Sequence, residues 1–210
     1  MKKVEPIRLE CVVRGFLYGQ AWKLYRQGEF FWGLKPPRGL ALAQEFPEPL
    51  FTPARKVRTG DDENITFSDL AILLGEEKAS KIKEVSLALY HRLREEWKKR
   101  GFIIADTKFE FGEREGKLIL INEASTPDSS RFWKISDYRP GQIQDSWDRD
   151  LLETYLNRKK WSPGAPPIPI SAYMRRKLAE RFHHLSSLLI TDHHTAGRLT
   201  EGNRRSDRME

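Results

Sequence analysis

Three charged side chains alternate along one stretch of the chain, and their types and spacing suit chemistry on phosphate. Asp106, Lys108 and Glu110 lie two residues apart in IADTKFEF. In a β-strand, side chains two positions apart leave the same face of the sheet. Carboxylate oxygens are the ligands that Mg²⁺ prefers, and a lysine neutralises a phosphoryl group in transfer. The stretch therefore predicts a site for Mg²⁺ and phosphate. The alternative is an exposed hairpin with ordinary cross-strand ion pairs.

A second group of polar residues follows in STPDSSRFW, residues 125–133. A proline, an aspartate, several hydroxyls and Arg131 in a short loop are typical of a clamp for phosphate or carboxylate. The planar guanidinium group of arginine binds such anions through two parallel hydrogen bonds. The alternative is a proline–aspartate turn that leaves Arg131 on the surface.

The elements that must position these residues follow from the pattern of apolar and turn residues. Strands are predicted for 4–14, 102–111 and 117–124, with GEREG joining the last two as a hairpin. Residues 34–64 contain five prolines and no periodicity, which predicts a long loop.

Helices are predicted where apolar residues recur at helical spacing. The longest covers about 76–100 and ends at Gly101, with an apolar stripe of Ile82, Val85, Leu89, Leu93 and Trp97. A short helix ends at Gly28, and another begins after the capping pair Thr66 and Asp69 and ends at Gly75. Two further helices are predicted for 145–161 and 171–190, separated by the proline-rich segment SPGAPPIPI.

Composition excludes several classes of protein. The 210 residues are 39% hydrophobic, which fits a globular chain. No apolar run approaches the roughly 18 residues of a membrane span, and the first residues, MKKVEPIRLE, lack the apolar stretch of a signal peptide. Cys11 is the single cysteine, so no intrachain disulfide can form. We therefore expect a cytoplasmic protein with no membrane partner.

The net charge of +7 favours anionic partners. Its distribution, however, is mixed. Residues 92–100 and 174–184 combine both signs at helical spacing, as solvated helix faces do. A stripe for nucleic acid would carry a single sign of charge. We therefore expect no nucleic-acid partner, and anionic small molecules remain.

Several blocks of the chain resemble one enzyme family. IIADTKFEFG and LINEASTPDSSRFW are similar to segments of the phosphoribosylaminoimidazole-succinocarboxamide synthases (SAICAR synthetases). The same holds, in the family's order, for ECVVRGFLYGQAWKLY, PEPLFTPARKVRTGDDENITF and QDSWDRDLLETYL. The resemblance covers about residues 4–190.

This resemblance implies a fold and an activity. The fold is α+β, an antiparallel sheet with flanking helices, with residues 1–190 as the larger, C-terminal lobe. Residues 191–210, which hold few apolar side chains, are predicted to be a disordered tail. The implied enzyme is a carbon–nitrogen ligase of purine biosynthesis. It joins L-aspartate to carboxyaminoimidazole ribonucleotide with ATP and Mg²⁺, through an acyl phosphate, giving SAICAR, ADP and phosphate.

The resemblance also assigns residues to roles. Lys108 and Asp106 match catalytic positions, and Lys56 and Glu110 match nucleotide-binding positions. Glu110 is also a metal ligand, and Asn122 stands where the family has a second one, an aspartate. The remaining matches bind substrate: Arg14, Asp62, Ser130 and Arg131.

The chain also departs from the family. Tyr18 and Gln20 replace small hydroxyl residues, one of which binds the substrate phosphate in the family. The family's N-terminal lobe, which covers the ATP phosphates, is missing. Two hypotheses remain. The first is a ligase component whose N-terminal lobe comes from a separate chain or was lost through a misassigned start codon, and the second is a catalytically inactive relative that binds nucleotide or assists assembly.

Overall fold

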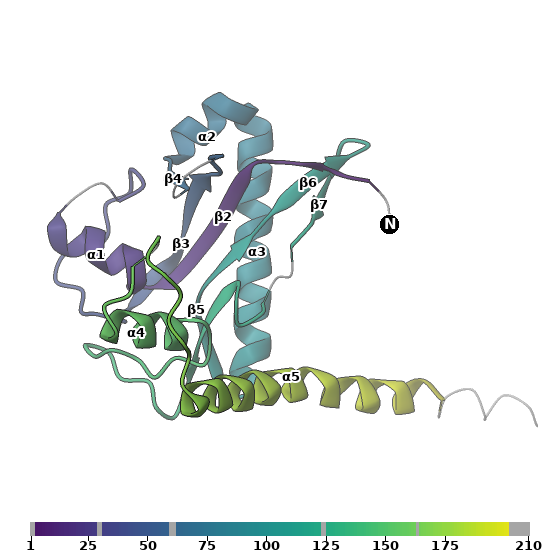
Figure 1. Cartoon of the computed structure of the whole chain (residues 1–210). Helices are drawn as coiled ribbons and strands as arrows, with labels where there is room; N and C mark the ends of the chain where they lie inside the picture. The colour runs from purple at the N-terminus through teal and green to yellow at the C-terminus, as the bar shows by residue number, and fades with distance from the viewer. Residues whose placement is uncertain (1–2, 29–30, 59–61, 123–124, 163, 202–210) are drawn as a thin grey trace, which may run out of the picture. The chain divides into compact units, whose positions relative to one another are not determined.

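The computed structural model (Figure 1) describes residues 3–28, 31–58, 62–122, 125–162 and 164–201, with side chains up to residue 189. The chain divides into two compact units, residues 1–149 and 150–210. The first unit carries every residue assigned to the site from the sequence. No helix in the described ranges has the length and apolar character needed to span a bilayer.

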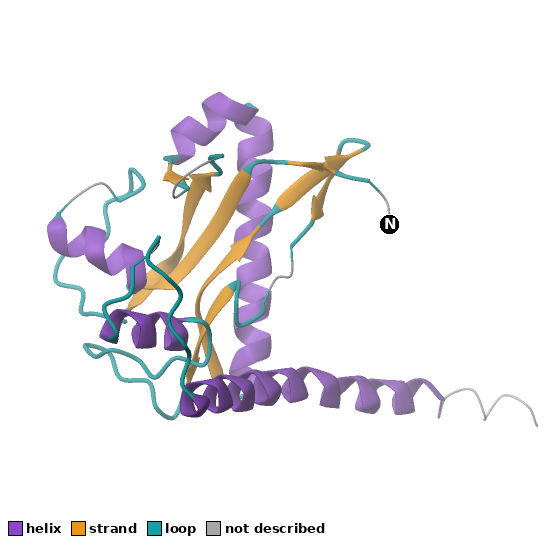
Figure 2. Ribbon diagram, viewed as in Figure 1, coloured by secondary structure: helices purple, strands orange, loops and turns teal. Residues whose placement is uncertain are grey.

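The first unit is built around a five-stranded antiparallel sheet of order β4-β3-β2-β5-β8 (Figure 2). Its strands are β2 (Leu9–Phe16), β3 (Glu45–Arg55), β4 (Glu63–Asn64), β5 (Phe102–Phe109) and β8 (Ser130–Lys134). In this register Arg14 faces Asp106 and Val12 faces Lys108. The predicted α+β class is confirmed.

The long helix α3 (Glu76–Lys99) covers one face of this sheet. The Cys11 thiol on β2 contacts Ser86 of α3, and Tyr90 Oη donates to the Ile104 carbonyl oxygen at 2.8 Å. Burial raises the pKa of Cys11 to about 12, so it stays a neutral thiol. Because strand side chains alternate, Glu10 and Arg14 of β2 face away from α3.

A β-bulge sets which residues of β5 share that outer face. Ile104 pairs with Phe132 and Thr107 with Ser130, so Ala105 and Asp106 together oppose Arg131. The extra residue shifts the alternation of side chains by one position. Ala105 packs in an apolar cluster with Phe16, Tyr18, Ala43 and Trp133. Asp106 follows on the same face, next to this cluster.

The expected loop over 34–64 is wrong in its second half, where β3 runs for 11 residues. Its neighbour β4 has only two residues, so among the described residues most of one edge of β3 has no strand beside it. Pro47 and Pro49 fall where the pairing with β2 is irregular, between Arg14 and Phe16. Proline is tolerated at such edges and irregularities, and this hid the strand in the sequence.

The predicted hairpin is only partly correct. The run 102–111 divides at Glu110: β5 stays in the main sheet, while β6 (Phe111–Arg114) enters a second sheet of order β1-β6-β7. There β6 pairs with β7 (Lys117–Leu120), and β1 (Glu5–Pro6) lies on the other side of β6. The turn therefore contains Gly116, whereas Gly112 lies within β6.

The helix predictions in this unit are confirmed. Helix α1 (Gly19–Gln27) ends at Gly28, which has φ 66°. Helix α2 (Phe67–Leu74) begins with the reciprocal capping box of Thr66 and Asp69. The buried stripe of α3 differs from the expected one, because Ser86 and Tyr90 are its central members. Ile82 and Trp97 belong to it as predicted.

The second unit contains α4 (Asp150–Arg158), the proline-rich connection and α5 (Ala172–Glu201). Tyr155 of α4 ties the connection down, since its hydroxyl donates to the Pro169 carbonyl oxygen at 3.3 Å and accepts from Ser171 N–H at 3.3 Å. Helix α5 continues beyond residue 190, where a tail was expected to begin. Residues 202–210 lie outside the described residues.

Gly15 is predicted to be essential for the packing of α3 on the sheet. A methyl group at this position would lie 2.0 Å from Tyr90 Oη. Gly15→Ala should therefore lower the free energy of unfolding by about 3 kcal/mol in denaturant titrations. Tyr90→Phe alone should cost about 1 kcal/mol through the lost hydrogen bond. The double variant should lose less than the sum, and strictly additive losses would contradict the proposed clash.

Candidate active site

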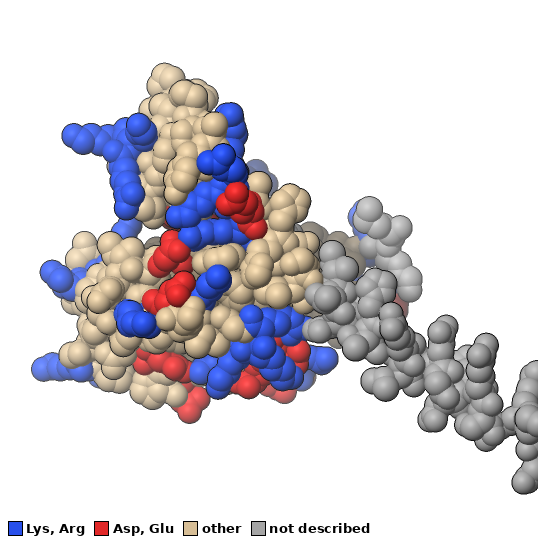
Figure 3. Space-filling view, turned by 90° about the horizontal axis from the view of Figure 1, so that it is seen from below, with Lys and Arg blue, Asp and Glu red and all other residues tan. Residues whose placement is uncertain are grey.

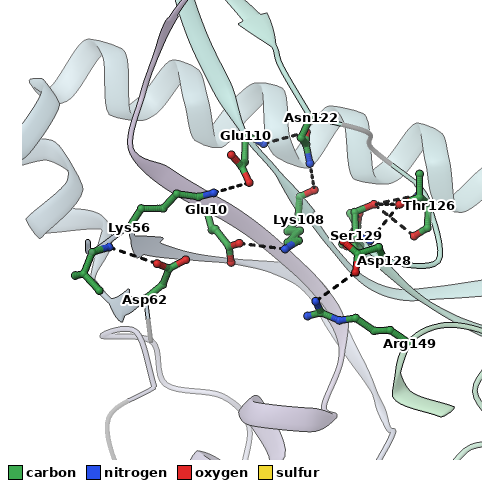
Figure 4. A network of polar contacts seen from close by, with 12 residues as sticks. Glu10, Lys56, Asp62, Lys108, Glu110, Asn122, Thr126, Asp128, Ser129 and Arg149 are labelled. Atoms are coloured by element: carbon green, nitrogen blue, oxygen red, sulfur yellow. Dashed lines mark hydrogen bonds and ion pairs between the residues drawn. The ribbon is translucent and has the colours of Figure 1, made fainter. Parts of the chain in front are cut away.

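A row of ion pairs crosses the outer face of the sheet, on the side opposite α3 (Figure 4). Lys108 Nζ on β5 lies 3.2 Å from Glu10 Oε1 on β2. Lys56 Nζ, just beyond β3, lies 2.7 Å from Glu110 Oε1, just beyond β5. These side chains are only partly exposed, so the row is a half-buried polar surface. The predicted alternation of Asp106, Lys108 and Glu110 is thus observed.

Asp106 ends this row between two arginines. Arg131 Nη1 donates to Asp106 Oδ2, and Arg14 Nη1 lies 3.5 Å from the same oxygen. Arg14 Nε also donates to Thr52 Oγ1 at 3.0 Å. Arg14 is 7% exposed and Asp106 9% exposed. Asp106 thus stands between two guanidinium groups, in a place with little access to water.

Burial lowers the pKa of Arg14, because it disfavours the charged form, and the neighbouring Arg131 acts in the same direction. The Asp106 carboxylate opposes both effects. A dehydrated, partly compensated positive charge of this kind is a favourable place for a further anion.

The start of α1 lies against Arg131. Gly19 has φ 56°, and a Cβ there would be 3.1 Å from Arg131 Nη2. Tyr18, the N-cap residue, makes no side-chain hydrogen bond to the helix. A cation is by itself unfavourable at the N-terminus of a helix, which carries partial positive charge. An anion there is attracted both by the helix dipole and by the cation. The arrangement therefore favours binding of a phosphate or carboxylate at this point.

Lys56 lies at the other end of the row. Burial opposes its charge, but the hydrogen bond to Glu110 and the nearby carboxylates of Glu10 and Asp62 together raise its pKa. Asp62 Oδ1 accepts from the Val57 backbone N–H at 3.4 Å. The structure thus brings Lys56, Asp62 and Glu110 together, and residues 59–61 lie outside the described part of the chain.

Asn122 fixes the backbone where β5 leaves the main sheet. Its Oδ1 accepts from the Glu110 N–H at 3.1 Å, and its Nδ2 donates to the Lys108 carbonyl oxygen at 3.1 Å. Because one backbone partner is a donor and the other an acceptor, they determine which side-chain atom of Asn122 is the oxygen and which is the nitrogen. Asn122 therefore lies beside Glu110, as expected of a pair of metal ligands, although both of its polar atoms already make a hydrogen bond.

Ser130 lies apart from the other predicted site residues. Its hydroxyl is 2.6 Å from Thr107 Oγ1, and it is 5% exposed. In β8 it shares a face with Phe132, whose ring packs against Trp97 of α3. The sequence placed Ser130 and Arg131 in one anion clamp, but adjacent strand residues point to opposite faces.

Glu10 and Thr52 are site residues that the sequence analysis did not identify. Glu10 could have been found, because it leaves the same face of β2 as Arg14, just as Asp106 and Lys108 leave the same face of β5. Thr52 gave no such signal, since it lies in the proline-rich segment that was expected to be a loop.

The described residues contain no group of three or more His, Cys, Asp and Glu side chains arranged to hold a metal ion. Glu110 and Asn122 together offer one carboxylate and one neutral amide oxygen. Mg²⁺ is commonly bound by one or two carboxylates together with substrate phosphates. The two residues therefore fit Mg²⁺ that arrives with a nucleotide, better than a metal ion held by protein ligands alone.

Charge on the rest of the surface is mixed. Figure 3 shows basic and acidic side chains next to one another on the face it presents. On α3, Lys81 pairs with Glu84, and Glu96 pairs with both Lys99 and Arg100. Exposed pairs of this kind contribute little to stability. They agree with the interpretation of the mixed-sign segments as solvated helix faces.

Asp106 is predicted to stabilise the fold through the two arginines. Asp106→Asn keeps the shape but removes the charge between them, and should lower the free energy of unfolding by about 3 kcal/mol. Phosphate added to the buffer should restore part of this loss. The control is Asp128→Asn, which weakens an exposed 3.7 Å pair with Arg149 and should change stability by less than about 1 kcal/mol. Equal effects of the two variants would contradict the prediction.

The sequence of this chain is similar to those of known proteins. A model of the SAICAR synthetase family matches residues 1–168. The phosphoribosylaminoimidazole-succinocarboxamide synthase of Thermodesulfovibrio yellowstonii is 46% identical over 193 residues, which cover 91% of this chain and 65% of the relative. The corresponding enzyme of Desulfotalea psychrophila is 45% identical over 84% of this chain and 61% of its own length.

Two solved structures are also similar. The SAICAR synthase of Saccharomyces cerevisiae, complexed with SAICAR, has a TM-score of 0.78 and 40% identity, covering 89% of this chain and 61% of that one. A type-2 SAICAR synthetase in complex with ADP has a TM-score of 0.57 and 26% identity, covering 80% and 67%. The chain spans roughly 60–65% of the length of its curated relatives. With the family model matching most of its residues, the chain belongs to the SAICAR synthetase family.

Proposed function

We propose that this chain supplies the acceptor- and nucleotide-binding part of an ATP-dependent ligase. The reaction joins L-aspartate to carboxyaminoimidazole ribonucleotide and gives SAICAR, ADP and phosphate. The observation that carries the proposal is a pair of arginines, the buried Arg14 and the partly buried Arg131, which share Asp106 beside the start of α1. The complexes of relatives with SAICAR and with ADP support the same ligand classes.

The chemistry explains why the site is rich in charge. A carboxylate is a poor electrophile, so the terminal phosphoryl group of ATP first passes to a carboxylate oxygen of the acceptor, giving an acyl phosphate and ADP. The aspartate amine then attacks the acyl carbon and loses a proton, while the bond to phosphate breaks. Both steps bring polyanions together, so catalysis depends on positioning and on compensating negative charge.

The roles follow the order of residues along the row. Arg14 and Arg131 bind the phosphate of the ribonucleotide, and Asp106 acts through them by holding their guanidinium groups. Lys108, in the middle of the row, neutralises charge on the phosphoryl group in transfer. Asp62 faces the acceptor from the loop after β3. Ser130 contributes through the packing of β8 beside Arg131.

Lys56 and Glu110 form the nucleotide end of the row. Glu110 would hold Mg²⁺, with Asn122 as a neutral second ligand through the remaining lone pair of Oδ1. When bound, Mg²⁺ supplies positive charge to the ATP phosphates. Lys56 is available to the nucleotide once Glu110 binds the cation, because the 2.7 Å ion pair between them must then open.

A partner for this chain is part of the proposal. The relatives are longer than the matched region, and we propose that an N-terminal lobe of the kind they carry completes the nucleotide site. The second candidate function is a catalytically inactive relative that binds nucleotide or assists assembly. The neutral amide at Asn122 favours this second candidate, because it provides no charge for Mg²⁺.

The proposed activity predicts aspartate-dependent release of ADP. The full chain is assayed with ATP, Mg²⁺, L-aspartate and carboxyaminoimidazole ribonucleotide, alone and with the N-terminal third of the Thermodesulfovibrio yellowstonii enzyme as a separate polypeptide. We expect ADP release with the added lobe, and at least a hundredfold loss in Glu110→Ala, since each step needs the nucleotide end of the row.

Omitting aspartate provides the background rate for this assay. A folded chain that releases no ADP above this background, with or without the lobe, would contradict the ligase and favour the inactive relative. ADP release that survives in Glu110→Ala would refute the assignment of Glu110 to nucleotide and Mg²⁺.

A further inference from the structure

Each of the two arginines at the proposed phosphate site lies over an aromatic ring. The Arg14 Cζ atom is 4.9 Å from the centroid of Trp32, and the Arg131 Cζ atom is 5.2 Å from the centroid of Tyr18. A guanidinium group is attracted to the face of such a ring, most strongly where water is excluded. The rings therefore cover one flat side of each cation.

Tyr18 is itself held in place from several directions. Its hydroxyl accepts from the Gln144 backbone N–H at 3.3 Å, and its ring meets Trp133 edge-on with centroids 5.0 Å apart. It is 9% exposed. Arg131 thus lies between the Tyr18 ring, the Asp106 carboxylate and the backbone of Gly19. Gly19 has no side chain that would separate its backbone from the guanidinium group.

Trp32 provides a similar support from a different segment. It is 2% exposed and packs edge-on against Phe31, with centroids 5.4 Å apart. Its φ of 52° lies in the left-handed region, which a bulky residue rarely adopts. Such a conformation persists only where the surroundings hold it, and it is common at functional sites. The indole ring is thereby fixed beneath Arg14.

We propose that Tyr18 and Trp32 are positioning residues, which fix the two guanidinium groups at the spacing that binds one phosphate monoester. This inference rests on the proposed function. Tyr18 and Gln20 occupy the two positions where the resemblance led us to expect small hydroxyl residues, one of which contacts phosphate. In this chain the ring of Tyr18 lies beneath Arg131 instead, so phosphate is bound mainly through the supported arginines.

The inference is tested by calorimetric titration of the full chain with ribose 5-phosphate. Tyr18→Phe keeps the ring and should bind within about twofold of the unmodified chain. Tyr18→Leu removes the ring and should bind about tenfold more weakly. Trp32→Phe and Trp32→Leu form a second, independent pair with the same expected contrast, which serves if Tyr18→Leu does not fold.

A matched control separates positioning from general damage to the core. Phe16 belongs to the same apolar cluster as Tyr18 and its ring also contacts Trp133, but it lies over neither arginine. The control variant is Phe16→Leu. It should lower the melting temperature about as much as Tyr18→Leu and leave the affinity for ribose 5-phosphate unchanged. Binding of ADP with Mg²⁺ at the Lys56 end should be unchanged in both.

The outcomes distinguish this inference from the function on which it rests. No binding of ribose 5-phosphate by the unmodified chain would overturn the proposed phosphate site itself. Binding by the unmodified chain that is equally strong in both leucine variants would overturn the positioning role alone. An equal loss in Phe16→Leu and Tyr18→Leu would also overturn it, because the effect would then come from the cluster and not from the ring over Arg131.

Discussion

Two guanidinium groups buried side by side repel each other and lose hydration, so they need a carboxylate between them. Asp106 is that carboxylate, and the order of the sheet puts it there. It lies on β5, between Arg14 on β2 and Arg131 on β8. Regular alternation with Lys108 and the pairing with Arg14 place Asp106 on the outer face, and the bulge brings Ala105 to the same face. Removing this charge would affect both the fold and the anion site.

The rest of the candidate site extends from this arrangement along the strands. The ion pairs of Lys108 and Lys56 continue the row up to the point where the chain leaves β5 for the second sheet. At this point the side chain of Asn122 hydrogen-bonds to the backbone of Glu110 and of Lys108. Glu110 therefore remains in line with Asp106 and Lys108. One end of the row thus favours a phosphate ester, and the other end favours a nucleotide with its cation.

The sequence predicted most helices and the charged row, because both depend on short periodic patterns. The period of two along β5 was enough to place Asp106, Lys108 and Glu110 on one face. The strand β3 was missed because its prolines are tolerated only through the geometry of its edge. The division of the chain at Glu110 was also missed, since a passage from one sheet to another has no local signature. The rings beneath the arginines depend on contacts between distant segments, and spacing alone cannot predict these.

The central claim is that the arginines sharing Asp106 form the binding site for the substrate phosphate. The most direct test is a crystal structure of this chain bound to ribose 5-phosphate. We expect phosphate oxygens within hydrogen-bonding distance of both Arg14 and Arg131, at the start of α1. A phosphate bound elsewhere on the protein, with both guanidinium groups still paired with Asp106, would contradict the claim.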